Sequence, residues 1–592
     1  MNLRQLNYIE KGINWIHDKL NEKQFLIFSS ILVGVSAGLA AVILKSFVHW
    51  IRLYLMEDLL FNFEFKYIYL LMPVIGIALT VIITKKFFKG NLHKGTDNIL
   101  FAIAKKSSFI PFNQMYSHII TSGITVGFGG SLGLESPIVS TGSAIGSNYA
   151  KRYRLGYKER TLLLAAGAAG GIAGAFNAPI AGILFALEVL LVDINITAFI
   201  PLLIASASGA LISKIVLQES ILLYFKLKLP FDYHNLPFYI ILGLIAGLVS
   251  LYHINFFEKV DKWMKGIKSA TARVLVAGIL LASLFAIFPT LFGEGYDSIK
   301  NLADIQPQLL YKQSVFSEFI NNQWMVLLFV FATFLVKAMA VGLTLGSGGN
   351  GGNFAPSLFI GAYMGFTFSF LLKLLGFHNI PVTNFILVGM AGTLCGVFHA
   401  PLTAIFLIAE ITGGYELIIP LMVVSSISYV VVKYYHPESA DVRKLKKRGT
   451  VISEDKDTSI LGKIEIHSLI EHDFIKINPD EKLRDIVEKI KESKRNIFPV
   501  VNKNNKLVGI ITLDHIKTEM FNQELYDSVI AKELMQKPET RIKYNEDIFS
   551  IMKKFEESGQ WNLPVTEKGL YVGFLSKSGI LTKYRDELLA SV

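Results

Sequence analysis

Two glycine-rich segments interrupt long apolar regions of the chain and carry a proline just after the break. Residues 133–137 read Gly-Leu-Glu-Ser-Pro, and residues 352–356 read Gly-Asn-Phe-Ala-Pro. Proline suits the first turn of a helix, so each segment predicts a helix that begins there. A helix start presents unpaired N–H groups and about half a positive charge, which can hold an anion without a cationic side chain. The segments therefore predict an anion site built largely from backbone.

Glu135 is the reactive side chain of the first segment. A carboxylate at a helix start competes with an anion for the same N–H groups, so Glu135 is predicted to be a gate that protonation releases. Burial in an apolar region raises the pKa of a carboxyl group toward the working range. The alternative is a glutamate that only caps its helix.

The elements that must position these residues are predicted to be membrane-spanning helices. The 592 residues are 52% hydrophobic, with a mean hydropathy of +0.46. Residues 161–187, 338–372 and 374–409 contain no Asp, Glu, Lys or Arg. Each run exceeds the roughly 20 residues that span a bilayer. Other apolar stretches are 25–44, 68–84, 198–213, 236–251, 274–291 and 325–336. We therefore expect an all-α polytopic membrane domain over residues 24–448.

This domain contains an internal repeat. Residues 177–188, Asn-Ala-Pro-Ile-Ala-Gly-Ile-Leu-Phe-Ala-Leu-Glu, match residues 399–410 at an offset of 222. Residues 133–137 pair with 352–356, and Gly-Thr-Asp-Asn-Ile at 95–99 pairs with Gly-Tyr-Asp-Ser-Ile at 295–299. Two repeats, about 24–215 and 235–435, predict an inverted-repeat transporter whose site lies at the repeat interface.

The order of three motifs, HKGTD at 93–97, GLESP at 133–137 and GNFAP at 352–356, resembles that of the CLC chloride channel and exchanger family. NAPIAGILFALE lies between the last two, and the resemblance covers nearly the whole chain. It implies an anion transporter rather than an enzyme, with Glu135 as the external gate. It also implies an anion site formed by the two helix starts. The residues concerned are Gly133, Leu134, Ser136, Asn353, Phe354 and Ala355.

The chain departs from the family pattern at two gate positions. The first motif usually carries a serine that meets the anion. The register places Lys94 there, whereas a shift of two residues lets Thr96 supply the hydroxyl. The family also places a tyrosine after the last membrane helix, and the matching residue is Asp441. Asp441 is the candidate inner gate, and its charge is expected to repel chloride.

A third position bears on mechanism. Family exchangers commonly hold an inner glutamate that relays protons, and the matching residue here is Val189. A branched apolar side chain cannot carry a proton. The neighbouring Glu188 has a repeat twin, Glu410, which favours a structural role. We therefore predict a chloride channel with weak or no proton coupling; the alternative is a proton-coupled chloride or fluoride exchanger.

Residues 449–592 alternate short strands and helices in two copies, about 465–522 and 528–588, and resemble a cytoplasmic CBS pair. Nucleotide-binding clefts of such pairs usually carry a Ser or Thr followed three residues later by Asp. Here Thr512 precedes His515, and Ser576 precedes Gly579. Adenine nucleotide binding and a purely structural platform both remain open, and the sequence requires no cofactor and contains no His-Glu-x-x-His metal motif.

The charge distribution predicts the topology. The formal net charge of +11 reflects basic clusters at 85–94 and 443–448, which are typical of cytoplasmic loops and do not require a nucleic acid partner. We expect a multi-pass protein of the cell membrane with both termini cytoplasmic and an amphipathic helix over residues 1–23. The expected partners are small anions, protons, membrane lipid and a second copy of the chain. Residues 198–212 and 417–432 are apolar on all sides and suit a homodimer interface.

Overall fold

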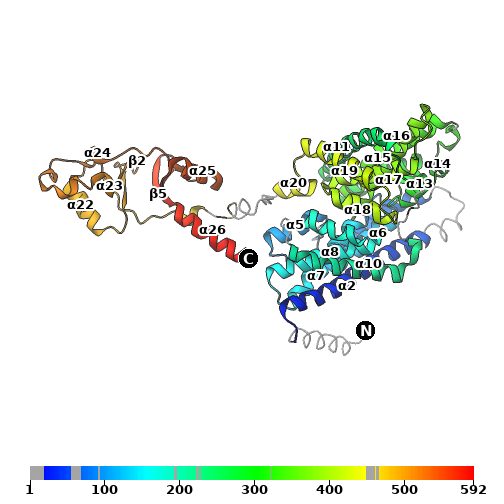
Figure 1. Ribbon diagram of the computed structural model, residues 1–592, viewed down its shortest axis with the longest axis horizontal. Helices are drawn as coiled ribbons and strands as arrows, with labels where there is room; N and C mark the ends of the chain where they lie inside the picture. Colours follow the sequence, from blue (N-terminus) through cyan, green and yellow to red (C-terminus); the bar gives the residue numbers. More distant parts are fainter. Residues whose placement is uncertain are drawn as a thin grey trace. The chain divides into compact units, whose positions relative to one another are not determined.

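The computed structural model describes residues 19–54, 68–90, 92, 94–191, 196–221, 225, 229–320, 322–447, 461, 464 and 466–591. The chain divides into two compact units, Met1–Ile452 and Ser453–Val592, and Figure 1 labels the helices and strands of each. Most of the predicted N-terminal helix, residues 1–18, lies outside the described residues, and helix α2 begins at Glu22.

The first unit is helical throughout its described part. Its first half contains α2 (Glu22–Leu53), α4 (Met72–Phe87), α5 (Thr96–Lys105), α6 (Gln114–Gly127), α7 (Glu135–Arg152), α8 (Tyr157–Phe176), α9 (Pro179–Phe185) and α10 (Ile196–Ile221). Its second half contains α11 (Leu236–Gly266), α12 (Ala270–Ile287), α13 (Tyr296–Ala303), α14 (Gln308–Tyr311), α15 (Gln323–Gly346), α16 (Phe354–Leu374), α17 (Val382–Phe398), α18 (Pro401–Ile411), α19 (Ile418–Tyr435) and α20 (Ala440–Lys447). Within the described ranges, eight helices are long and apolar enough to cross a membrane. The predicted polytopic helical fold is confirmed.

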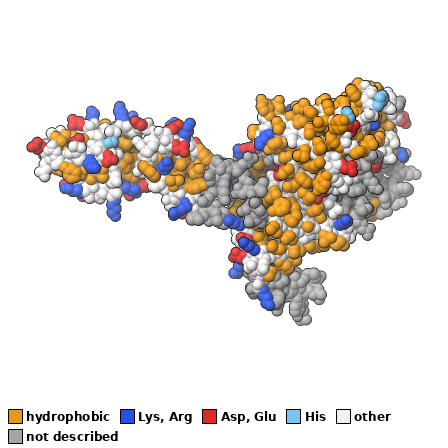
Figure 2. Space-filling view, viewed as in Figure 1, with side chains coloured by type: hydrophobic (Ala, Val, Ile, Leu, Met, Phe, Trp, Pro, Cys, Tyr) orange, Lys and Arg blue, Asp and Glu red, His pale blue; other side chains and the backbone are white. Residues whose placement is uncertain are grey.

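The outer surface of this unit agrees with a lipid environment. Figure 2 shows hydrophobic side chains over much of its visible face, whereas the visible face of the second unit is studded with Lys, Arg, Asp and Glu. A soluble protein rarely exposes so large a continuous apolar area.

The sequence repeat appears as a repeated local structure. Helix α8 is followed by the C-cap residue Asn177, with φ 53°, and α17 by the C-cap residue His399, with φ 57°; a short helix that starts with proline comes next in each repeat. The carboxylate of Glu410 accepts two backbone hydrogen bonds at the start of α9, and that of Glu188 accepts two at the start of α18. The four N–H···O distances are 2.8–2.9 Å, from Ile180, Ala181, Leu402 and Thr403. Each repeat therefore caps a helix of the other.

Close backbone packing fixes the position of α7, which begins at Glu135. A methyl group added at Gly142 of α7 would lie 2.1 Å from the carbonyl oxygen of Gly167 in α8. Only glycine permits this approach of two helix backbones. Helix α7 therefore has little freedom to move relative to α8.

The second unit contains two similar α/β segments. In the first, β1 (Ile497–Val501) pairs antiparallel with β2 (Leu507–Thr512), beside α22 (Leu483–Glu492), α23 (Leu513–Ile516) and α24 (Ala531–Leu534). In the second, β3 (Ile542–Lys543) is parallel to β4 (Asn562–Glu567), which pairs antiparallel with β5 (Leu570–Ser576), beside α25 (Ile548–Ser558) and α26 (Lys577–Ser591). A parallel bridge from Ile477 to Val500 gives the first segment the same strand order.

Candidate anion pathway

A cavity of about 90 Å³ lies where four helices of the first unit begin. Thr96 of α5, Ser136 of α7, Asn353 before α16 and Asp441 of α20 all line it. The other lining residues are Gly95, Val189, Ile254, Phe257, Leu345, Gly351, Gly352, Val397, Phe398, Ser439, Ala440 and Lys444. Helix starts carry partial positive charge and unpaired N–H groups, so their convergence favours an anion in this space. The sequence predicted two of these helix starts from their glycine and proline residues.

The two central helix starts are joined through their glycines. The N–H of Gly133 donates to the carbonyl oxygen of Gly352 at 2.9 Å, and the N–H of Gly352 donates back at 2.8 Å. A Cβ added at Gly352 would lie 2.4 Å from the Cβ of Ser136. We expected the N–H of Gly133 to face an anion, but it is bonded to the backbone of Gly352. Gly133 therefore joins the starts of α7 and α16.

The Glu135 side chain is buried, with 1% of the residue exposed. Its Oε1 accepts a hydrogen bond of 2.6 Å from the hydroxyl of Tyr296, at the start of α13. Its Oε2 has no hydrogen-bond partner among the described residues. A Cβ added at Gly133 would lie 2.3 Å from this Oε2 and 2.9 Å from the backbone N of Ala355. The carboxyl group therefore occupies the space that Gly133 leaves open beside the start of α16.

Tyr296 was not among the predicted site residues, although the repeat contained a signal for it. Residues 95–99 pair with residues 295–299, so Tyr296 is the repeat partner of Thr96. One of these hydroxyl-bearing residues lines the cavity, and the other contacts the predicted gate.

The geometry separates the two alternatives for the first motif. The Lys94 ammonium donates to the carbonyl oxygens of Gly348 and Gly349 at 2.7 and 2.8 Å. Thr96, not Lys94, is among the cavity-lining residues. Lys94 therefore ties the first motif to the glycine-rich loop before α16, and Thr96 is the residue placed to offer a hydroxyl to an anion.

Asp441 has a nearby cation that sequence reasoning missed. The Nζ of Lys444, one turn later in α20, lies 3.8 Å from Asp441 Oδ1, and both residues line the cavity. The i, i+3 spacing was the available signal. The expected repulsion of chloride by Asp441 is therefore offset by the positive charge of the neighbouring Lys444.

The remaining predicted residues lie around these contacts. Val189 lines the cavity. The Asn353 Oδ1 lies 2.8 Å from Nε2 of the buried His253, which orients the amide. The Phe354 ring packs 5.4 Å from that of Phe398, centroid to centroid. Leu134 is fully buried immediately before α7.

A family model described as voltage gated chloride channel matches residues 76–433. The chain belongs to the CLC family. A CBS domain model matches residues 466–522 of the same chain. Anion transport is the shared activity of CLC proteins, so this CLC chain is an integral membrane protein of an anion-transporting family.

Named relatives of this CLC chain include voltage-gated ClC-type chloride channels ClcB of Escherichia coli strains SMS-3-5 and E24377A. Both are 28% identical over 323 residues, which cover 54% of this chain and 73% of the relative. Similar solved structures include a slow cyanobacterial Cl⁻/H⁺ antiporter, with a TM-score of 0.61 and 22% identity over 72% of this chain and 98% of that one. A CLC-type fluoride/proton antiporter has a TM-score of 0.57 and 23% identity, covering 70% and 96% of the two chains. A eukaryotic CLC transporter has a TM-score of 0.60 and 18% identity, covering 94% and 97%. These structures establish the CLC fold.

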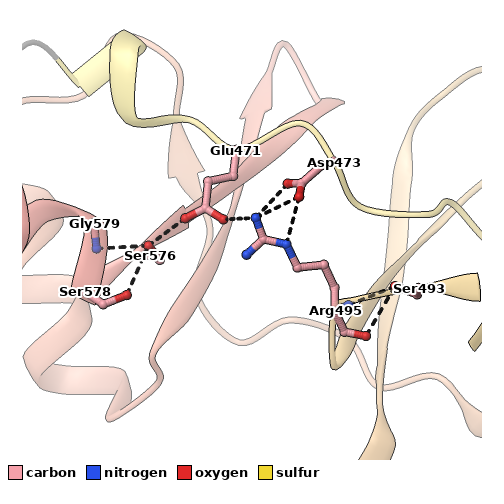
Figure 3. Close-up of polar contacts among 7 residues, drawn as sticks. All are labelled: Glu471, Asp473, Ser493, Arg495, Ser576, Ser578 and Gly579. Atoms are coloured by element: carbon pink, nitrogen blue, oxygen red, sulfur yellow. Dashed lines mark hydrogen bonds and ion pairs between the residues drawn. The ribbon is translucent and has the colours of Figure 1, made fainter.

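In the CBS region, Ser576 and Thr512, the two residues at the hydroxyl positions of the nucleotide pattern, both make contacts within the protein. Figure 3 shows Ser576 donating to Glu471 Oε1 at 2.7 Å and accepting from the N–H of Gly579 at 3.1 Å. The Arg495 guanidinium bridges Glu471 at 2.6 Å and Asp473 at 2.8 Å. Its hydrogen bond lowers the pKa of the Asp473 carboxyl group.

At the other position, the backbone N–H of Thr512 donates to Nδ1 of His515 at 3.4 Å, at the start of α23. These internal contacts favour the structural-platform alternative for the CBS region.

Proposed function

We propose that this CLC chain is a chloride channel gated by Glu135, with weak or no proton coupling. The observation that carries the proposal is the cavity at four helix starts, with the apolar Val189 where family exchangers commonly hold a glutamate. The cavity supplies favourable electrostatics for an anion but no carboxyl group at the relay position.

The gate works by competition. The ionised Glu135 carboxylate lies beside the start of α16, where N–H groups such as that of Ala355 attract negative charge. Protonation removes the charge of Glu135 and weakens this attraction, so the side chain leaves and an anion takes its place. External acid is therefore expected to open the pathway.

Thr96 and the Asp441–Lys444 pair contribute the opposite end of the pathway. The Thr96 hydroxyl can donate to an anion in the cavity, and Lys444 offsets the negative charge of Asp441. In this proposal the pair replaces the tyrosine that the family places at the inner gate.

The alternative function is a proton-coupled exchanger of chloride or fluoride. The similar structures named as Cl⁻/H⁺ and F⁻/H⁺ antiporters favour it, as does the presence of titratable groups, Asp441 and Lys444, at the cavity. A water chain through the cavity could then serve as the relay in place of an inner glutamate.

We also propose a homodimer in the cell membrane, with both termini cytoplasmic. Helices α9 and α18 have 7 and 11 residues and are too short to span a bilayer, yet the caps at their starts are carboxylates. Exposing carboxylates to lipid is energetically costly. A second copy of the chain would cover these caps together with the apolar faces of α10 and α19, and this supports the proposed homodimer. Cross-linking in membranes that yields only monomers would contradict it.

The gate is tested by anion efflux from proteoliposomes at a series of external pH values. Wild-type flux should rise as the external pH falls, and Glu135→Gln should give high flux that is nearly independent of pH. A wild-type flux that does not change with pH, or a pH dependence that survives in Glu135→Gln, would remove Glu135 as the gate.

A further inference from the structure

A second carboxyl group with a buried oxygen, that of the half-buried Glu294, lies in the loop between α12 and α13. Its Oε1 is buried without a hydrogen-bond partner among the described residues, and its carboxyl group lies against the backbone N–H of Leu134. Leu134 immediately precedes the gate residue, Glu135. Glu294 therefore contacts the same helix start that the gate occupies.

The loop that carries Glu294 is fixed to the loop before α7. The N–H of Gly293 donates to the carbonyl oxygen of Gly129 at 3.0 Å. The ammonium of Lys337, on α15, donates to Ser131 Oγ at 2.8 Å and to the Gly293 carbonyl oxygen at 3.4 Å. These bonds hold Gly293, next to Glu294, against the loop that precedes α7. They therefore fix the position of Glu294 relative to Glu135.

Charged groups from four elements surround the two carboxyl groups. Lys45 and Arg52 of α2, Lys337 of α15 and Glu135 of α7 all act electrostatically on Glu294. Tyr296 of α13 interacts electrostatically with both carboxylates, and Lys300 of α13 interacts electrostatically with Lys45. The two buried lysines, each with no more than 6% exposed, balance the two carboxylates in charge. Because the charges are balanced, one proton added to the pair leaves a net charge of only about one unit in the cluster.

The cluster also has a connection to solvent. Arg52 forms a 2.7 Å ion pair with Asp297, and both side chains are more than half exposed. Asp297 follows Tyr296 directly, so one short segment runs from the exposed ion pair to the tyrosine that holds the gate. Burial, and the nearby Glu135 carboxylate, raise the pKa of Glu294, which lies outside the membrane-spanning helices.

We propose that Glu294 is a second protonatable group of the gate, which takes protons from solvent near the Arg52–Asp297 pair and shares them with Glu135. The proton leaves one carboxyl group as the other gains it, so no further reactant is needed. This inference rests on the proposed function of Glu135 as the gate. Its consequence is that the acidity at which the gate opens belongs to the pair of carboxyl groups and not to Glu135 alone.

Glu294→Gln tests the inference in the proteoliposome efflux assay. While Glu294 is ionised, its negative charge favours protonation of Glu135; without it, Lys45 and Lys337 favour the ionised gate. The pH of half-maximal flux should therefore fall by about one unit, a tenfold change in proton concentration, while flux at saturating acid stays close to that of wild type. Glutamine keeps the shape of the side chain and an oxygen that can face the Leu134 N–H.

Two variants complete the design. Glu294→Asp keeps a titratable group and should return the midpoint toward that of wild type. Glu318→Gln removes an exposed carboxylate that is not among these charged groups and should leave the midpoint unchanged, because charges in water are screened. A Glu294→Gln protein that retains flux with an unshifted midpoint overturns the role of Glu294. If Glu294→Gln does not assemble, a Glu294→Asp midpoint identical to that of Glu294→Ala overturns it instead. A wild-type flux without pH dependence would overturn the Glu135 gate itself, which keeps the two failures distinct.

Discussion

Replacing Tyr296 by phenylalanine should loosen the gate. The Tyr296 hydroxyl donates a 2.6 Å hydrogen bond to Glu135 Oε1, and the other carboxyl oxygen has no hydrogen-bond partner among the described residues. A hydrogen bond to a charged group contributes about 1.5–3 kcal/mol. Since about 1.4 kcal/mol is a factor of ten, its loss should raise flux at neutral pH by roughly tenfold or more. The lost bond also favoured the ionised carboxylate, so the pH of half-maximal flux should rise by about one unit or more.

The assay is anion efflux from proteoliposomes as a function of external pH. Tyr363→Phe is a matched control, because Tyr363 is a fully buried tyrosine of α16 whose ring stacks on Phe359 and whose hydroxyl makes no hydrogen bond to Glu135 among the described residues. If Tyr296→Phe has the neutral-pH flux and the midpoint of wild type while Glu135→Gln opens the pathway, the hydrogen bond does not hold the gate, and the reasoning is refuted.

Three further predictions concern other contacts. Lys444→Gln should lower anion flux several-fold and Asp441→Asn should raise it, as measured by efflux, because the two charges line one cavity; equal effects in both variants would contradict the pairing. Glu188→Gln should weaken the cap of α18 and lower thermal stability by about 1 kcal/mol or more without changing the flux midpoint; a midpoint shift would instead indicate a proton role. Arg495 depresses the pKa of Asp473, so this pair stabilises the fold above the unfolded pKa of about 3.9 and loses that contribution as pH falls through the lower folded value. Protection factors for hydrogen exchange over residues 466–591 of the full-length protein should therefore fall in acid more in wild type than in Asp473→Asn, by a small amount because the pair is exposed.

Local sequence signals predicted the helix starts of the site well. Glycine and proline act within a few residues, so residues 133–137 and 352–356 indicated where α7 and α16 begin without knowledge of the rest of the fold. The repeat indicated that Glu188 and Glu410 have equivalent structural roles, and their reciprocal caps agree with that.

Contacts between distant segments were beyond sequence reasoning. Tyr296 reaches Glu135 across 161 positions, and Lys94 reaches Gly348 across 254. Neither side chain is special in type, and only the packing of the two repeats brings each to its partner. Backbone pairing was hidden as well, because the bridge between Gly133 and Gly352 uses N–H groups that every residue has.

The most direct test of the proposed channel is to impose a chloride gradient on proteoliposomes and to follow proton movement. The account predicts that chloride runs down its gradient with little or no uphill proton transport, because Val189 leaves the relay position at the cavity without a protonatable side chain. Val189→Glu is the informative companion variant, since it adds a carboxyl group at that position. Uphill proton transport by the wild-type protein that disappears in Glu135→Gln would contradict the channel and establish an exchanger.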